Sequence, residues 1–168
     1  MIRLAQLKPT DVTDDYVNWY DSKEVIKYSD NQYRSFSLDY QISYVDNCSK
    51  NEDIELYGIF DKKKHIGNIS LSGLKSYHPT GEISYVIGDT CYWGKGIASE
   101  AVKLIIEIAS SKHSLHKLFA GVSSKNIASQ KVLMKTGFSL EGIRKEHLFY
   151  NNEWQDQYDY GLILKNRL

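Results

Sequence analysis

The sequence predicts a single domain of the α+β class. The chain has 168 residues, which is the size of one ordinary domain and is long enough to bury a sizeable core. Its first half contains strand-like and helix-like runs that end in an antiparallel meander. Its second half alternates strand, helix, strand and helix before a closing hairpin. Because no linker, repeat or low-complexity segment divides the chain, we expect one domain over residues 1–168.

The first half of the chain is expected to form a strand, two helices and a β-hairpin. Apolar and polar residues alternate at the start, as they do in a half-buried strand. Thr13 and Ser37 are each placed to begin a helix, because their hydroxyl groups can accept a hydrogen bond from a free N–H group of the first turn. The predicted elements are a strand at 2–7, helices at 14–20 and 37–45, and hairpin strands at 55–60 and 65–71.

The second half is expected to place a strand and a long amphipathic helix on either side of a glycine-containing loop. The strand alternates between one face with Ile83, Tyr85 and Ile87 and another with Glu82, Ser84 and Val86. Gly137 is placed to end the last helix in the left-handed conformation. The predicted elements are a strand at 81–88, a helix at 96–110, a strand at 118–122, a helix from 126, and strands at 143–150 and 154–164.

Charge and cysteine content narrow the class of partner. With 21 basic and 21 acidic residues the formal net charge is zero, which argues against nucleic acid or a membrane surface held by bulk electrostatics. Cys48 and Cys91 lack zinc-ligand spacing and are too few for a disulfide framework, so we expect no metal and a reducing, cytoplasmic compartment. We recognise no signal peptide and no apolar run of transmembrane length. Any anion must then be bound by local groups.

The most informative segment is the loop Tyr-Trp-Gly-Lys-Gly-Ile-Ala at residues 92–98. Its glycines allow a tight turn and a close approach to a ligand, while the N–H groups and the dipole of the following helix face an anion. Lys95 adds one local positive charge. Neither the GxxxxGK[ST] phosphate loop nor the GxGxxG dinucleotide pattern is present. The segment is typical of a pyrophosphate site, although two glycines before a helix also occur in ordinary turns.

Three blocks of the sequence resemble the GNAT superfamily of acetyl-CoA-dependent N-acetyltransferases. The first block, residues 93–98 followed by Glu100 and Ala101, is similar to the acetyl-CoA loop of that family, with Trp93 in place of the usual Arg or Gln. The second block is residues 126–138, and the third is residues 141–156. The resemblance covers the chain in element order. It is closest to the branch that includes ribosomal-protein N-terminal, spermidine and nucleotide-amino-sugar acetyltransferases.

The resemblance implies a central mixed, mostly antiparallel twisted sheet flanked by helices. Its central strands, 81–88 and 118–122, would splay apart to form a V-shaped slot for acetyl-CoA, with no metal or further cofactor. Backbone groups in the slot would pair with the pantetheine arm as an added strand does. The glycine loop would hold the pyrophosphate. The cofactor-binding residues that the resemblance implies are Tyr85, Val86, Ile87, Trp93, Gly94, Lys95, Gly96, Ile97, Ala98, Asn126, Ser129 and Lys135.

The catalytic groups are expected on strand 81–88 and on the helix that follows. Glu82 is the first candidate for the base that deprotonates the amine, and Ser84 is placed to orient a water on the same face. The alternative for Glu82 is an ordinary cross-strand pair. Family members place a Tyr acid where this chain has Leu133, so Ser129 is left as a candidate donor to the departing thiolate, with solvent as the alternative. Weaker candidates for the base are His78 and His147.

The acceptor amine is expected to meet aromatic and charged side chains of the N-terminal region and the closing hairpin. The expected acceptor-binding residues are Trp19, Tyr33, Arg34, His78, Arg144, Tyr150 and Trp154. Rings with charges of both signs favour a polar acceptor that carries sugar or phosphate groups, whereas a polyamine site should be plainly acidic. Residues 16–29, 65–69 and 88–89 also resemble acetyltransferases of bacterial surface-sugar biosynthesis, and this resemblance implies acetylation of a nucleotide-linked amino sugar in bacterial surface-polysaccharide biosynthesis. Protein N-terminal or polyamine acetylation is the alternative, and a CoA-binding sensor module is the non-catalytic one.

The oligomeric state is not decided by the sequence. The closing hairpin offers a strand edge at which a second copy of the chain could pair, so a homodimer is compatible with it.

Overall fold

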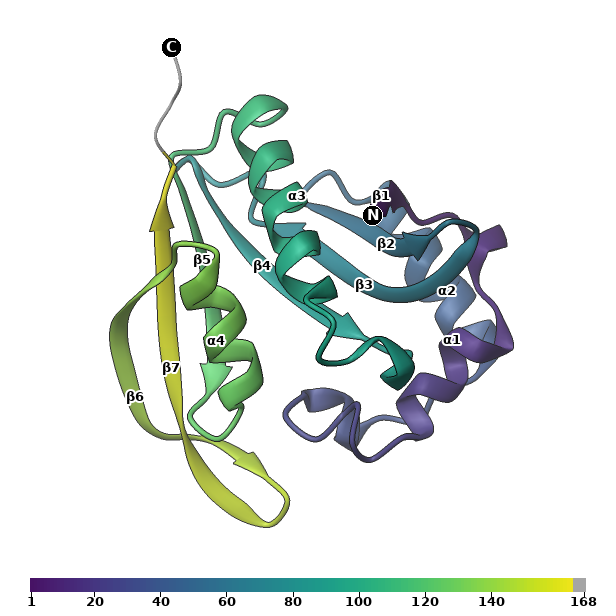
Figure 1. The fold of residues 1–168 in the computed structure, drawn as a ribbon. Helices are drawn as coiled ribbons and strands as arrows, with labels where there is room; N and C mark the ends of the chain where they lie inside the picture. Colours follow the sequence, from purple (N-terminus) through teal and green to yellow (C-terminus); the bar gives the residue numbers. More distant parts are fainter. Residues whose placement is uncertain (165–168) are drawn as a thin grey trace.

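One seven-stranded sheet organises the computed structural model, which describes residues 1–164. The strands follow the order β1-β2-β3-β4-β5-β7-β6, and every neighbouring pair is antiparallel except β4 and β5, which are parallel (Figure 1). The strand bounds are β1 Ile2–Gln6, β2 Ile54–Asp61, β3 Lys64–Ser72, β4 Thr80–Ile87, β5 Lys117–Ser123, β6 Ser139–Tyr150 and β7 Glu153–Ile163. The predicted mixed, mostly antiparallel sheet is confirmed.

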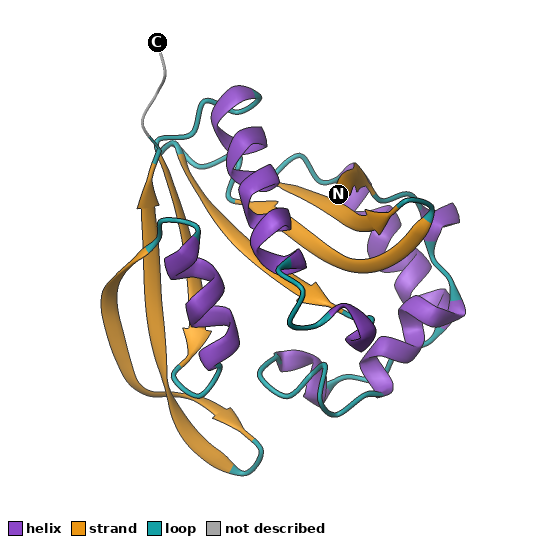
Figure 2. Ribbon diagram, viewed as in Figure 1, coloured by secondary structure: helices purple, strands orange, loops and turns teal. Residues whose placement is uncertain are grey.

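Four α-helices accompany the sheet within residues 1–164 (Figure 2). They are α1 Asp14–Asn18, α2 Leu38–Lys50, α3 Ile97–Ser111 and α4 Ile127–Lys135. The predicted helix over 14–20 is shorter than expected, because α1 gives way at Trp19 to a single 3₁₀ turn that ends at Asp21. None of the helices in the described residues is long and apolar enough to cross a membrane.

The two faces of the sheet are covered by different helices because side chains alternate along each strand. Ile69, Leu71 and Ile83 point to one face, where they form a core with the buried side chains of α3, among them Ile105. The opposite face carries residues such as Leu56, which pack with the buried side chains of α1 and α2 in a second core. Burying a residue such as Ile105 completely stabilises the fold by about 1.5–3 kcal/mol.

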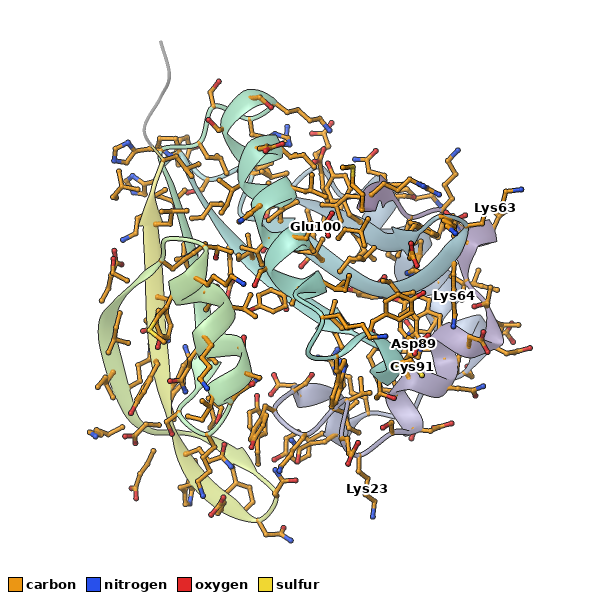
Figure 3. All side chains as sticks on the ribbon, in the orientation of Figure 1. Lys23, Lys63, Lys64, Asp89, Cys91 and Glu100 are labelled. Atoms are coloured by element: carbon orange, nitrogen blue, oxygen red, sulfur yellow. The ribbon has the colours of Figure 1, made fainter. Side chains whose placement is uncertain are left out.

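Helix α3 lies along one face of the sheet because its apolar residues recur at helical spacing. Ala101, Val102, Ile105 and Ala109 are each fully buried. Glu100, in the first turn, accepts a hydrogen bond of 3.0 Å from the backbone N–H of Ile2 and so ties the first strand to this helix (Figure 3). The helix therefore fixes the position of the loop that precedes it.

The central strands β4 and β5 are paired over only part of their length. The parallel pairing runs from Thr80 opposite Lys117 to Glu82 opposite Phe119 and then stops. Both strands continue, β4 to Ile87 and β5 to Ser123, and they diverge in the ribbon (Figure 1). Residues 83–87 pair with β3 and residues 120–123 pair with β7, but the two segments do not pair with each other. We call these two segments the β4–β5 split. This divergence of the two strands corresponds to the splaying that the family resemblance implies.

Helix α2 begins at a side-chain cap whose contribution can be measured. The Ser37 hydroxyl accepts a hydrogen bond of 3.1 Å from the N–H of Tyr40. We expect Ser37→Ala to lower the free energy of unfolding by about 1 kcal/mol in a urea titration, because one N–H group loses its partner. Ser43→Ala, at an exposed position inside the same helix, should leave stability unchanged or raise it slightly. Equal losses in both variants would show that the cap contributes nothing.

Candidate active site

The inner edge of β4 carries free backbone groups along the β4–β5 split. The N–H of Gly88 donates to the carbonyl of Ile66 on β3 at 3.0 Å. Backbone groups alternate between the two edges of a strand, so Val86 also turns its groups to β3, while Tyr85 and Ile87 turn theirs to the split. The backbone pairing expected of Val86 is thus taken by β3. Tyr85 and Ile87 remain in position to pair with a strand-like ligand.

Glu82 and Ser84 lie on the face of β4 that points away from α3. Both side chains are exposed, whereas their neighbour Ile83 is buried on the α3 face. Glu82 lies opposite Ser72 on β3 and opposite Phe119 on β5, and no ion pair within residues 1–164 includes it. The ordinary cross-strand charge pair therefore does not account for this carboxylate.

The loop between β4 and α3 has the backbone of an anion site. Gly94 and Gly96 adopt left-handed conformations with φ of 72° and 78°, which favour glycine. A Cβ atom added at either position would meet no protein atom within 4 Å, so the space in front of this turn is open. No side chain caps α3, which leaves the N–H groups of its first turn, at Ile97 and Ala98, for a ligand. The loop fits the pyrophosphate of acetyl-CoA.

Side chains around the loop hold it against the end of β4. Trp93 donates its indole N–H to the carbonyl of Ile87 at 2.8 Å. Trp93 thus links the turn to the strand edge, a role that the sequence did not suggest. Lys95 places its ammonium 5.7 Å from the centre of the Tyr92 ring and is exposed, so its charge is free to meet an anion.

Asp89 supports the start of the same loop. One carboxylate oxygen accepts a hydrogen bond of 3.0 Å from the N–H of Cys91, and the other pairs with Lys64 at 2.7 Å (Figure 3). The hydrogen bond from Lys64 lowers the pKa of Asp89 below its usual value. Its charge and these two contacts are therefore kept through the neutral range.

Helix α4 begins across the split from β4. The Asn126 side chain accepts a hydrogen bond of 3.1 Å from the N–H of Ser129, as expected of a helix cap. The Ser129 hydroxyl lies 2.8 Å from the phenolic oxygen of Tyr85, so the two elements touch across the split. Leu133 is fully buried and offers no acid. Lys135 is exposed in the last turn of the helix.

The Tyr85 side chain is the contact that sequence reasoning missed. Alternation along β4 already placed it on the α3 face with Ile83 and Ile87, and a hydroxyl among those apolar neighbours was the available sign of a polar partner. Burial raises the pKa of Tyr85 to about 12, so the phenol stays protonated at neutral pH.

The N-terminal region and the closing hairpin meet on the side where the acceptor was expected. Tyr150 is buried and donates its hydroxyl proton to the Asp30 carboxylate at 2.8 Å. The amide of Asn151 donates to the carbonyl of Lys27 at 3.0 Å. The rings of Tyr33 and Tyr150 are 6.4 Å apart. The predicted grouping of Tyr33 with Tyr150 is therefore present.

Other residues expected at the acceptor site lie elsewhere or are engaged. Trp19 is buried in the second core, where it packs against Gly88, and is not exposed to an acceptor. His78 is exposed just before β4 begins, at the end where β4 and β5 are still paired. Trp154 packs beside Phe149, which alternation places on the face opposite to Tyr150.

The two predicted arginines differ in their contacts. Arg144 donates to Asp159 at 2.7 Å and is thus already paired with an acid. Arg34 is exposed at the end of the 3₁₀ turn Asp30–Tyr33, close to Tyr33 in the chain.

Two cavities in the described residues lie apart from the β4–β5 split. One, of about 630 Å³, is lined by residues of β1, α2 and β2 and by His113 beyond α3. The other, of about 340 Å³, lies between α1, the start of β3 and residues 88–90 beyond the end of β4, and Trp19 is among its lining residues. We assign the site to the split because inward backbone groups of β4 line it, the glycine loop follows β4 at one end, and the unpaired carboxylate of Glu82 lies at the other end, where the pairing with β5 stops.

Comparisons with known proteins indicate the family that this chain resembles. The family model described as acetyltransferase (GNAT) domain matches residues 2–139. The probable N-acetyltransferase YjcK of Bacillus subtilis is 35% identical over 116 residues, which cover 67% of this chain and 63% of that protein. A ribosomal-protein-serine acetyltransferase of Escherichia coli is 28% identical over 113 residues, covering 67% of this chain and 63% of that protein. The chain thus matches less than two thirds of the length of these two relatives.

A solved structure shares the whole fold. The crystal structure of spermidine N-acetyltransferase from Vibrio cholerae in complex with CoA and spermine superposes with a TM-score of 0.87. The two sequences are 20% identical, and the alignment covers 98% of this chain and 96% of the other. Together with the family model, which spans most of the chain, the fold leads to one conclusion: this chain belongs to the GNAT acetyltransferase family.

Proposed function

We propose that this chain transfers the acetyl group of acetyl-CoA to the N-terminal α-amine of a protein. The observation that carries the proposal is the exposed carboxylate of Glu82 beside the β4–β5 split, which has no ion-pair partner in the described residues and can serve as the base for one amine. The relatives named as ribosomal-protein acetyltransferases support an acceptor of this kind.

The chain offers groups that suit the pyrophosphate and the pantetheine arm of acetyl-CoA. When bound, acetyl-CoA would supply an activated thioester. The glycine turn, Lys95 and the free N–H groups of α3 suit the pyrophosphate. The inward backbone groups of Tyr85 and Ile87 suit the amides of the pantetheine arm, although the Ile87 carbonyl must first release Trp93. On the α4 side, Asn126 and Ser129 lie at the start of the helix, where Ser129 contacts Tyr85, and Lys135 adds an exposed cation in the last turn.

The residues around Glu82 can carry out the proton transfers of amide formation. Glu82 takes a proton from the ammonium form of the acceptor, directly or through a water held by Ser84. The amine nitrogen then bonds to the thioester carbon and loses its second proton to solvent, while the C–S bond breaks with its electron pair passing to sulfur. A thiol with an ordinary pKa of about 8.5 is a tolerable leaving group, so a strong acid is not needed.

Charge pairing argues against a polyamine acceptor. Most acidic groups near the hairpin are already engaged: Asp156 with Lys145, Asp159 with Arg144, Glu153 with Lys125, and Asp30 with Tyr150, whereas Glu146 has no ion-pair partner in the described residues. A polyamine needs several carboxylates free for its several cations. The amino-sugar acceptor favoured by the sequence needs several cations for its diphosphate, but of the two predicted arginines Arg144 is paired with Asp159 and Arg34 alone is left. We therefore prefer the protein N-terminus over both.

A panel of acceptors tests the proposal. Purified protein is mixed with acetyl-CoA, and release of free thiol is followed with a peptide that has a free N-terminal Ser, the same peptide with its N-terminus blocked, spermidine, and a nucleotide-linked amino sugar. We expect release with the free peptide alone. Faster release with spermidine or with the amino sugar would overturn the acceptor assignment. Binding of acetyl-CoA without release on any amine would favour the sensor module.

A further inference from the structure

The side chain of Tyr85 crosses the β4–β5 split and joins its two sides. Its phenolic oxygen lies 2.8 Å from the hydroxyl oxygen of Ser129 and 3.3 Å from the Ser129 carbonyl oxygen. Ser129 is 44 residues away in the chain and belongs to the first turn of α4. The two strands that flank the split are no longer paired at this level, so this hydrogen bond connects elements that backbone pairing leaves apart.

Among the described residues, the hydroxyl of Ser129 is the one side-chain group that hydrogen-bonds to the Tyr85 hydroxyl. The neighbouring side chains on its face of β4, Ile83 and Ile87, are apolar, and Leu133 of α4 is fully buried in the same core. The N–H of Ser129 is fixed by the Asn126 cap, so the Ser129 side chain starts from a fixed point of the backbone. The pair is therefore held in place from both ends.

The hydroxyl groups of Tyr85 and Ser129 have two protons between them, and the hydrogen bond that joins them uses one. Each hydroxyl carries one proton, and a phenol is a stronger acid than an aliphatic alcohol, which makes Tyr85 the better donor of the two. The Tyr85 proton has two acceptors on Ser129, the hydroxyl at 2.8 Å and the carbonyl at 3.3 Å, and the shorter contact favours the hydroxyl. When Tyr85 donates to the Ser129 hydroxyl, the Ser129 proton has no role within the pair. That proton is then free to point into the split, where the thioester sulfur of acetyl-CoA would lie.

We propose that Tyr85 is a positioning residue, whose hydroxyl donates to Ser129 and thereby directs the Ser129 proton toward the sulfur that leaves during acetyl transfer. The inference rests on the proposed acyl transfer but not on the identity of the acceptor. When the C–S bond breaks, the electron pair stays on sulfur as a thiolate, which accepts a hydrogen bond from Ser129. The proton that finally neutralises the thiolate comes from solvent.

Hydrogen bonding, rather than transfer of the Tyr85 proton, is the step that the acidities allow. The pKa of Tyr85 is raised by burial to about 12, whereas a thiol has a pKa of about 8.5. Moving the phenolic proton to the thiolate would therefore be unfavourable by more than three powers of ten. A hydrogen bond to a charged acceptor, in contrast, stabilises it about tenfold or more without any transfer.

A measurement on bound CoA, without any acceptor, tests this inference. The thiol of CoA bound to the protein is titrated by its thiolate absorbance, as a difference spectrum against bound desulfo-CoA. We expect the bound thiol to have a pKa below that of free CoA, and Tyr85→Phe to raise it by about one unit. A bound thiol that titrates identically in the wild type and in Tyr85→Phe would overturn the inference, whatever the acceptor panel shows.

A double-mutant cycle separates positioning from a purely structural role. With the best acceptor of the panel, Tyr85→Phe should lower kcat about tenfold and leave the KM for acetyl-CoA unchanged. In a Ser129→Ala background it should cause no further loss, whereas in Ser129→Thr, which keeps a hydroxyl, the loss should return. Additive losses, or a raised KM with unchanged kcat, would show that Tyr85 has only a structural role.

The matched control is Tyr57→Phe. Tyr57 is buried in the same core and its hydroxyl donates to Glu55 on β2, away from the split. This variant removes a phenolic hydrogen bond from the same core, here one to a carboxylate, but should leave both kcat and the pKa of the bound thiol unchanged. Equal effects of the two substitutions would mean that the Tyr85 effect comes from general destabilisation of the core.

Discussion

Replacing Glu82 by Gln is expected to lower kcat for acetyl transfer by about 10²- to 10⁴-fold, which is the contribution typical of a positioned general base. Gln keeps the shape of the side chain but cannot accept the proton of an ammonium group. The affinity for acetyl-CoA should not change, because Glu82 points away from the α3 face and from the glycine loop. Steady-state kinetics and a separate titration with acetyl-CoA measure the two quantities.

The dependence of this loss on pH identifies its cause. An N-terminal α-amine has a pKa near 8, so at higher pH it loses its proton without help and the defect of Glu82→Gln should shrink. Glu146→Gln, at an exposed position on β6, serves as a control for a surface change of the same kind and should keep the wild-type rate. Wild-type turnover of Glu82→Gln across the whole pH range would remove Glu82 from the mechanism.

Replacing Gly96 by Ala is expected to weaken acetyl-CoA binding ten- to a hundredfold. The residue has φ of 78°, a left-handed conformation that costs an L residue about 1–2 kcal/mol. The added Cβ would also occupy the open space in front of the turn, where at least one N–H group is expected to donate to the pyrophosphate. Loss of one hydrogen bond to a charged group lowers affinity by this amount. Titration calorimetry with acetyl-CoA measures it.

Gly73→Ala is a matched control for backbone strain. Gly73 has φ of 83° in the loop between β3 and β4, and a Cβ added there would meet only ordinary contacts. Its substitution should cost a similar amount of stability but leave acetyl-CoA affinity unchanged. If the two variants lost affinity equally, the effect would come from strain alone and the glycine loop would not be the cofactor site.

Much of the fold follows from local patterns. The strand predicted at 81–88 is β4 at Thr80–Ile87, and the helix predicted at 96–110 is α3 at Ile97–Ser111. The two faces of β4 are also as predicted, because alternation is a property of the strand itself. The closing strand predicted from 143 begins earlier, at Ser139, because irregular register next to Gly142 hides the alternation.

Contacts between distant segments could not be predicted in the same way. Asp30 and Tyr150 are 120 residues apart, and nothing in either local pattern indicates that they meet. Trp19 looked like an acceptor-binding ring, but its environment is decided by how α1 packs on the sheet, which buries it against Gly88. The bond between Tyr85 and Ser129 likewise depends on how far β4 and β5 diverge. Sequence patterns specify faces, whereas tertiary packing decides which faces touch.

The acetyl balance of the reaction tests whether this site acetylates an amine. Protein, acetyl-CoA and a peptide with a free N-terminus are incubated together, the free thiol is titrated, and the peptide is analysed by mass spectrometry. We expect one acetyl group on the peptide α-amine for each thiol released, with both signals strongly reduced in Glu82→Gln. Thiol release without acetylated peptide, or no release although acetyl-CoA binds, would contradict the assignment of this site to amine acetylation.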